Sequence, residues 1–407
     1  MKESSAATAD LLRKLADSYV REGQVADDEA EADRAEYDLG PVEDGPRVGR
    51  AATEIAPVPQ RRDYIKSLRV AGLKSFERAT LSLSPLTVVI GEIASGKSTL
   101  AEALALLRRA AGPRFVDEID ELFSGMGSLL RAGTRELDVA VTIGDVDGSV
   151  AELAYEMTVV RETSGRARVL HDRLLDVSAG KTRLLSDARL AERHRGGESD
   201  EARAAFHRVT HALRRLEVHV GFDVASSWAA RAAARGGGAR DAAPPAPGDR
   251  VHLFGSSLAS AYAALRTRPT WSTELLPDVK RVLTDAVDLR VRPEARTGNP
   301  VLTVARGAQD TRTDELSGGE LAWLALIATL ALAEGTRTLV VLDEPTPMIP
   351  VALVAPLLER YASRGVRLLY LTSARAILDR LSNPERDVRL SARGPQGRSI
   401  LEPFCRP

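Results

Sequence analysis

The sequence predicts an α/β protein in which a mixed sheet is flanked by helices. Residues 338–344 and 366–372 have the hydrophobicity of strands buried in a parallel sheet, and residues 86–90 cluster apolar and β-branched side chains as a strand does. Residues 99–111 show the apolar spacing of a helix, and residues 320–335 are apolar on every side, which indicates a helix buried in the core. Such strands and helices are expected to form a sheet with helices on both faces.

Further strands are expected in the amino-terminal half, where β-branched and apolar residues alternate or cluster over short lengths. They cover 64–70, 79–83, 136–143 and 151–160. Residues 161–300 lack this pattern, and we expect a mostly helical insertion there.

The composition limits the classes of protein to which the chain can belong. With 44% apolar and 28% charged residues in 407, the chain fits a globular protein and excludes collagen-like and wholly disordered classes. The formal net charge is −1, so the chain as a whole does not attract a polyanion. Cys405 is the single cysteine, and no apolar run approaches the roughly 18 residues that span a membrane. We therefore expect a cytoplasmic protein without a membrane partner.

The charge is unevenly distributed along the chain. Residues 1–60 hold 14 acidic and 7 basic side chains, and proline and glycine recur between 40 and 60. We expect an acidic arm and linker there, which serves either as a solubilising tail or as a docking segment for a partner.

The strongest local motif is GEIASGKST, residues 91–99, which has the GxxxxGK[ST] spacing of a phosphate-binding loop between a strand and a helix. Glycines let successive backbone N–H groups turn toward phosphate, and the following helix adds its positive end. Lys97 is expected to reach the β- and γ-phosphates, and Ser98 to offer its hydroxyl to Mg²⁺. The predicted nucleotide-binding residues are Gly91, Ala94, Ser95, Gly96, Lys97, Ser98 and Thr99.

A second motif ends the buried strand at 338–344, where Asp343 and Glu344 lie at its carboxyl edge. Open α/β sheets bind ligands at this edge. Asp343 is expected to hold magnesium together with Ser98, and Glu344 to deprotonate the attacking water. Glu344 and Lys97 are thus the predicted catalytic residues of a nucleoside triphosphatase.

A third motif, LSGGE at 316–320, directly precedes the apolar helix. Ser317, Gly318 and Gly319 place backbone N–H groups at a helix N-terminus, which makes a second anion-binding cradle in the same chain. It could cap the γ-phosphate of a nucleotide that a phosphate loop holds from the other side.

Together GEIASGKST, LSGGE and VVLDEP (340–345) resemble the ATP-binding-cassette ATPases, specifically the soluble RecF-like, SMC-like and OLD-like group that includes prokaryotic AAA-type ATPases. The segment 64–107, with Phe76 in a typical position, looks like the opening of those proteins, and 251–265 looks like the region before their signature motif. The resemblance implies an ATPase head that binds ATP with Mg²⁺. It also implies a homodimer or higher homo-oligomer, in which Ser317–Gly319 of one head completes the site of the other.

The sequence departs from that family at positions that couple ATP binding to hydrolysis. No glutamine occurs between Lys97 and Gln309 to serve as the lasso residue, and Ser373 stands where the family has its switch histidine. The aspartate expected just after VVLDEP is missing, since the next one is Asp379, and Ile93 and Ala94 replace the usual Asn-Gly pair. We expect tight ATP binding with slow hydrolysis.

Signals within 161–300 are weaker. Arg208, His211 and Arg215 share a helical spacing that could contact nucleic-acid phosphates or simply form a solvated face. His207 and His211 could bind zinc only with further ligands. The expected organisation is an acidic arm and linker at 1–60, a first ATPase lobe with the phosphate loop at 61–160, the helical insertion at 161–300 and a second lobe with the signature motif and Asp343 at 301–407.

The resemblance implies a function in DNA repair or phage defence, in which ATP-dependent dimerisation of the heads controls DNA binding or a separate effector protein. Two alternatives remain open: the nucleotide-binding subunit of a membrane transporter, and a structural ATP switch that barely hydrolyses.

Overall fold

The computed structural model describes residues 63–405 apart from 113, 146–149, 188–198, 222–250, 252–256, 294–299, 308, 346–347 and 395–396. The predicted acidic arm at 1–60 lies outside the described residues, so its expected role stays a prediction. Residues Asp63–Pro407 form one compact unit.

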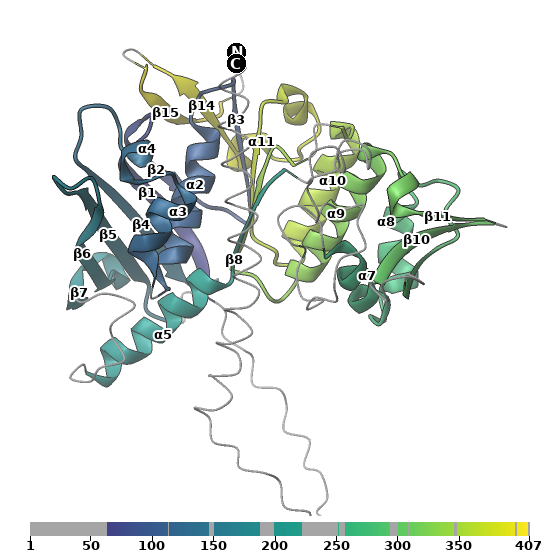
Figure 1. Ribbon diagram of the computed structural model, residues 1–407, viewed down its shortest axis with the longest axis horizontal. Coiled ribbons are helices and arrows are strands. Elements are labelled where there is room, and N and C mark those ends of the chain that lie inside the picture. The colour runs from purple at the N-terminus through teal and green to yellow at the C-terminus, as the bar shows by residue number, and fades with distance from the viewer. Residues whose placement is uncertain are drawn as a thin grey trace, which may run out of the picture. The chain divides into compact units, whose positions relative to one another are not determined.

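Three sheets build this unit (Figure 1). The first is antiparallel, in the order β2-β1-β4-β5-β6-β7, and the second, the mixed sheet, has the order β15-β14-β3-β13-β12-β8. The third is a small antiparallel sheet in the order β11-β10-β9. The strands are β1 Tyr64–Leu73, β2 Phe76–Ser82, β3 Leu86–Gly91, β4 Glu136–Gly144, β5 Leu153–Arg161, β6 Ala167–Asp176, β7 Arg183–Asp187, β8 Leu216–Val220, β9 Asp288–Pro293, β10 Pro300–Arg306, β11 Gln309–Arg312, β12 Leu339–Asp343, β13 Leu368–Thr372, β14 Val388–Arg393 and β15 Ser399–Pro403.

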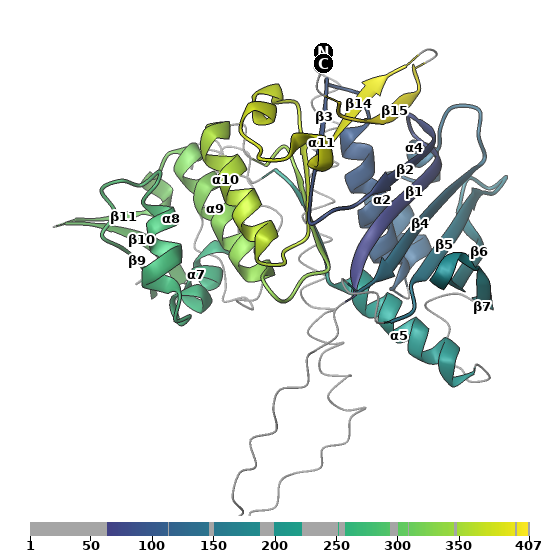
Figure 2. The ribbon, with the colours of Figure 1, turned by 180° about the vertical axis from the view of Figure 1, so that it is seen from behind.

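Helices cover both faces of the mixed sheet, as Figures 1 and 2 show from opposite sides. Helix α2 packs between this sheet and the antiparallel one, and α9 and α10 cover the other face. The helices are α2 Lys97–Ala110, α3 Phe115–Leu122, α4 Met126–Leu129, α5 Asp200–Arg214, α7 Leu258–Arg266, α8 Leu276–Val279, α9 Gly318–Ala333, α10 Val351–Ser363 and α11 Pro384–Asp387. The predicted α/β class, with a mixed sheet and flanking helices, is confirmed.

The two cores follow from the alternation of side chains in the central strands. In β12, Leu339 and Val341 face the core shared with α2, whereas Val340 and Leu342 face the core shared with α9. A strand buried on both faces needs apolar residues at every position, which is why its sequence is continuously hydrophobic. Helix α9 lies in the second core with every residue from Leu321 to Ala333 buried, as its uniform apolarity predicts.

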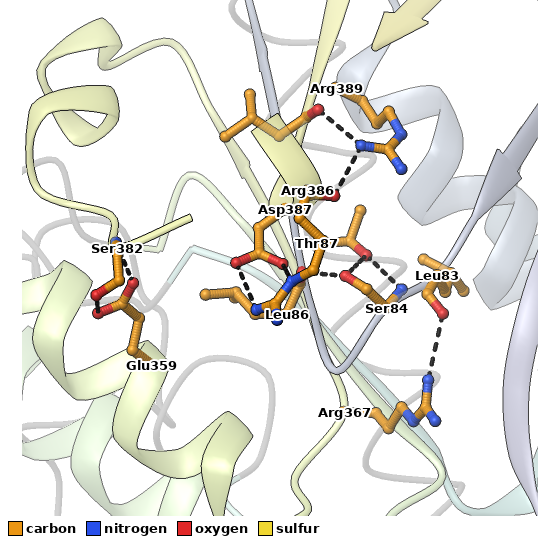
Figure 3. Close-up of polar contacts among 11 residues, drawn as sticks. Leu83, Ser84, Leu86, Thr87, Glu359, Arg367, Ser382, Arg386, Asp387 and Arg389 are labelled. Carbon is orange, nitrogen blue, oxygen red and sulfur yellow. Dashed lines mark hydrogen bonds and ion pairs between the residues drawn. The ribbon is translucent and has the colours of Figure 1, made fainter. Parts of the chain in front are cut away.

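Polar contacts lie at the amino end of β3 and at the start of β14 (Figure 3). The Arg367 guanidinium donates to the Leu83 carbonyl at 3.2 Å, and the Ser84 backbone N–H donates to Thr87 Oγ1 at 3.0 Å. On β14 the Arg389 guanidinium donates to the Arg386 carbonyl at 3.0 Å. The first two contacts satisfy polar groups where the chain enters β3.

Residues 161–300 contain the expected helices α5, α7 and α8, but also strands that the sequence did not predict. Strands β6 and β7 extend the antiparallel sheet, and β8 forms the edge of the mixed sheet, parallel to β12. This segment therefore contributes strands to the same sheets as the rest of the compact unit. The glycine- and proline-rich stretch at 236–249 lies outside the described residues.

Among the residues that the structure describes, no helix combines the length and the apolarity that crossing a membrane would require.

Candidate functional site

The candidate site begins where β3 ends and α2 starts. The loop 92–96 between them turns because Gly96, the residue before α2, has a φ of 103°, which favours glycine. The first turn of α2 carries no acidic side chain, so the positive end of the helix is not neutralised locally. This geometry presents backbone N–H groups and a positive field to an anion, as the motif predicts.

Lys97 Nζ lies over this loop. It donates hydrogen bonds of 2.9 Å to the carbonyl oxygens of Gly91 and Glu92, and the lysine side chain is largely buried. The ammonium group therefore already points into the loop, where a β- or γ-phosphate would receive it.

Two glycines of the loop are required by close packing. A Cβ on Gly91 would overlap the carbonyl oxygen of Ser391 in β14, and a Cβ on Gly96 would collide with the Ser399 side chain in β15 and lie 3.0 Å from the Phe76 ring. The C-terminal hairpin β14–β15, which the sequence analysis did not identify, thus packs directly against the phosphate-binding loop.

Ala94 adopts a left-handed conformation, with a φ of 63°. This is the position where the resembling family has glycine, and the loop keeps the conformation although the glycine is absent. For a non-glycine residue this backbone state costs about 1–2 kcal/mol.

The carboxyl end of β12 places Asp343 and Glu344 beside the loop, because β13 alone separates β12 from β3 in the mixed sheet. Glu344 has a φ of 45°, and its N–H donates to the Leu371 carbonyl of β13 at 3.0 Å. Such a backbone conformation is uncommon outside glycine and persists only where the surroundings hold it.

Asp343 is 3% exposed, and burial raises the pKa of its carboxyl group. A hydrogen bond from the Ser98 side chain and the nearby Lys97 charge oppose that effect, whereas the Glu344 charge adds to it. Within the described part of the chain, no group donates a hydrogen bond to Asp343 Oδ1.

These side chains fit a magnesium-bound nucleotide. A buried carboxylate oxygen without a donor, next to a serine hydroxyl, is the set of oxygen ligands that Mg²⁺ takes in nucleotide sites. Ser95 Oγ, also buried, has no hydrogen-bond partner among the described residues and lies within the loop. A bound cation would give Asp343 Oδ1 a partner, and a bound phosphate would give Ser95 Oγ one.

The carboxyl end of β13 lies between the loop and Asp343. Ser373, which stands where the resembling family has its switch histidine, directly follows this strand and is exposed. The Ala374 N–H donates to Thr372 Oγ1 at 3.1 Å, which turns the chain there. Arg375 begins the 3₁₀ turn Arg375–Asp379, and its guanidinium lies 3.4 Å from the Glu92 carboxylate of the phosphate loop.

The signature motif caps α9. Ser317 Oγ accepts a hydrogen bond from the Glu320 N–H at 3.2 Å, and the Ser317 N–H donates to Glu320 Oε2 at 2.7 Å. This capping box fixes the first turn of α9. Burial of Glu320 disfavours its charge, but hydrogen bonds from Ser317 and Arg306 outweigh burial and lower its pKa. Gly318 and Gly319, the first two residues of α9, are partly exposed.

Two large apolar side chains near these motifs are exposed, and the sequence analysis did not interpret them as such. Ile93, in the phosphate loop, is 91% exposed. Met348 is 61% exposed, and its carbonyl oxygen would lie 3.3 Å from a Cβ on Gly319.

The nucleic-acid surface considered for α5 is not supported. Arg208 forms an ion pair with Asp63, with an Nη2–Oδ1 distance of 2.6 Å, and also contacts the Ala151 carbonyl. Arg215 lies beyond the end of α5 and donates to the carbonyl oxygens of Gly335 and Thr336. Both arginines therefore bind within the protein. Across the described residues, no three His, Cys, Asp or Glu side chains gather as a metal site, so the zinc alternative at His207 and His211 gains no support.

Comparisons with known proteins agree with this geometry. Residues 86–347 match the model of a family described as "AAA domain, putative AbiEii toxin, Type IV TA system". Those residues include the phosphate loop, the signature motif and Asp343, and no curated protein matches the chain.

Three solved structures are similar at low identity. The SMC head domain from Thermotoga maritima is 16% identical, with a TM-score of 0.43, and the match covers 84% of this chain and 100% of that one. An Smc head domain from Pyrococcus furiosus bound to the C-terminal domain of ScpA is 14% identical, with a TM-score of 0.47 and coverage of 84% and 97%. A Pyrococcus yayanosii Smc head with a coiled coil and joint is 11% identical, with a TM-score of 0.47 and coverage of 84% and 98%.

Proposed function

Because the chain belongs to the family of AAA domains described as putative AbiEii toxins of type IV toxin–antitoxin systems, we propose that it binds and slowly hydrolyses ATP and that ATP brings two copies together. The joined heads would control DNA binding or a separate effector protein, in DNA repair or phage defence. The observation that carries the proposal is the convergence of Lys97, Ser98 and Asp343 at one edge of the mixed sheet.

Each residue has a distinct task in ATP hydrolysis. Lys97 exchanges its two carbonyl contacts for β- and γ-phosphate oxygens, and Ser98 and Asp343 hold the magnesium ion. Magnesium, when bound, neutralises charge on the phosphates. Glu344, fixed beside Asp343 by its N–H bond to Leu371, accepts a proton from the attacking water. Slow turnover is expected because Ser373 cannot supply the imidazole of a switch histidine.

A second copy is the proposed source of the γ-phosphate cap. Gly318 and Gly319 present a helix N-terminus that no acidic neighbour other than the capping Glu320 offsets in its first turn. Ile93 beside the nucleotide and Met348 beside the signature motif are exposed apolar side chains, and burying them against a second copy would favour association. Val220, which pairs with Asp343 from the adjoining strand β8, is a further exposed apolar side chain, at 53%.

The test is nucleotide binding and oligomeric state in three variants. Lys97→Ala is expected to lower affinity for Mg-ATP by at least about 100-fold, whereas Lys280→Ala, which changes an exposed lysine directly after α8, is expected to leave it unchanged. Glu344→Gln is expected to accumulate an ATP-bound dimer on size-exclusion chromatography with light scattering, and the exposed Glu385→Gln is its control. Equal ATP affinity in Lys97→Ala and wild type would contradict ATP binding at this loop. A Glu344→Gln protein that binds ATP but stays monomeric would contradict dimerisation.

Filter binding of duplex and single-stranded DNA, with and without ATP, tests the downstream step. ATP-dependent retention supports control of DNA binding, whereas no retention in any condition leaves the effector protein as the proposed target.

A further inference from the structure

The end of strand β13 places a cation next to the phosphate loop. Arg375 is the first positively charged residue after this strand, and its Nη2 lies 3.4 Å from Glu92 Oε1. Glu92 is the second residue of the loop motif, directly after Gly91. Since β13 lies between β3 and β12, the Arg375 side chain reaches the loop from the side on which Asp343 and Glu344 lie.

The ion pair between Arg375 and Glu92 is weak. The two side chains are 75% and 84% exposed, and the pair makes only this contact of 3.4 Å. Exposed pairs of this kind contribute little, because water and salt screen them and both side chains lose freedom. Arg375 can therefore leave Glu92 for a stronger partner at little cost.

Glu92 is contacted by two cations from two directions. Its carbonyl oxygen accepts a hydrogen bond from Lys97 Nζ at 2.9 Å, and its carboxylate faces Arg375. A phosphate that drew Lys97 out of the loop would bring negative charge close to the Glu92 carboxylate. Repulsion between those like charges would release Arg375, whose planar guanidinium forms strong charge-assisted hydrogen bonds with phosphate oxygens.

We propose that Arg375 binds the terminal phosphate of ATP, and that Glu92 competes with this phosphate for the arginine. This inference rests on the proposed function, since it requires ATP in the loop. ADP lacks the terminal phosphate, so it leaves the Arg375–Glu92 pair intact. Arg375 thus gives the site a preference for triphosphate over diphosphate, at the strand end where Ser373 has no charge, and Glu92 limits that preference by competing for the arginine.

The experiment measures the affinities of a non-hydrolysable ATP analogue and of ADP, both with Mg²⁺, by calorimetry. Arg375→Ala is expected to weaken analogue binding about 10- to 100-fold and to change ADP binding by less than about twofold. The analogue affinity of Arg375→Lys is expected to lie between those of wild type and Arg375→Ala, since lysine keeps the charge but loses the planar set of donors. Glu92→Gln is expected to tighten analogue binding a few-fold, and this gain should vanish in the Arg375→Ala background.

Arg380→Ala is the matched control, because Arg380 is an exposed arginine just after the same 3₁₀ turn. An Arg375→Ala protein with the wild-type ratio of analogue to ADP affinity would overturn the inference and leave ATP binding by Lys97 intact. A wild-type protein that binds neither nucleotide would overturn the proposed function and this inference together.

Discussion

The hydroxyl of Ser391 donates a hydrogen bond of 2.8 Å to the carbonyl oxygen of Ser95, and so ties the phosphate loop to a strand 296 residues further along the chain. Ser391 is also the residue of β14 that lies in register with Gly91, at the end of β3. In the adjoining β15, the Ser399 N–H donates to the Ser75 carbonyl at 2.9 Å. The C-terminal hairpin therefore supports the loop from one side, as α2 does from the other.

Replacing Ser391 by alanine tests this support. The variant loses one hydrogen bond to a carbonyl within the loop, so we expect nucleotide affinity to fall about 3- to 10-fold while the protein stays folded. Ser363→Ala is the matched control, because Ser363 Oγ donates to the Arg360 carbonyl at 2.7 Å on an exposed helix end. Calorimetric titration with Mg-ATP measures both. If the two variants bind nucleotide equally well, the hairpin does not hold the loop.

The elements that line the nucleotide site could be predicted because their signals are local. The loop is specified by glycines and a lysine within nine residues, and β3, β12 and β13 are specified by continuous apolar runs. Helix α9 is specified by apolarity on all sides. The hydrophobicity or glycine content of each segment is enough to indicate its conformation and burial, and the structure confirms these elements.

The partners of those elements could not be predicted, because they depend on contacts between distant segments. Strand β8 follows α5 directly, and Leu216 continues the apolar spacing of Val209 and Leu213, so the sequence alone favoured a longer helix. The open edge of β12 offers parallel pairing to 216–220, and this tertiary contact outweighs the helical pattern. The sequence analysis did not predict the hairpin β14–β15. Its strand β14 pairs with β3, which lies about 300 residues earlier in the chain.

The signature serine allows the proposed role in a dimer to be separated from its role in folding. Ser317 caps α9, and Ser199 caps α5 by the same kind of bond to the N–H three residues on. Replacing either by alanine removes a helix cap and is expected to lower the free energy of unfolding by about 1 kcal/mol. Only Ser317→Ala is expected to weaken ATP-dependent dimerisation, measured by light scattering in the Glu344→Gln background. Equal dimerisation of both variants would argue against a contribution of Ser317 to the partner's site.

Glu217, His219 and Arg337 form a charged cluster in which the Glu217 side chain is buried. Glu217 in β8 contacts His219 Nε2 at 2.6 Å and Arg337 Nε at 2.7 Å. The cluster joins β8, at the edge of the mixed sheet, to the turn after α9, and Glu217 lies three residues before Val220, the partner of Asp343. Burial disfavours the Glu217 charge, but the hydrogen bond and charge of His219, with those of Arg337, outweigh burial and lower its pKa to about 2.

A carboxylate whose pKa is lower in the folded state than in the unfolded chain stabilises the fold above its unfolded value and loses that effect as pH falls toward the folded value. Glu217 therefore stabilises the protein at neutral pH, and its contribution is expected to disappear between pH 4.5 and about 2. Glu217→Gln leaves His219 and Arg337 facing a neutral amide, so we expect the free energy of unfolding at pH 7 to fall by about 3–5 kcal/mol. The difference between variant and wild type should shrink toward pH 2, as urea denaturation across this range can measure.

Glu201→Gln is the control, because Glu201 pairs with Arg183 on the surface, where water screens the pair, and little change is expected. A Glu217→Gln deficit that persists unchanged down to pH 2 would show that lost packing, and not the buried charge, destabilises the variant.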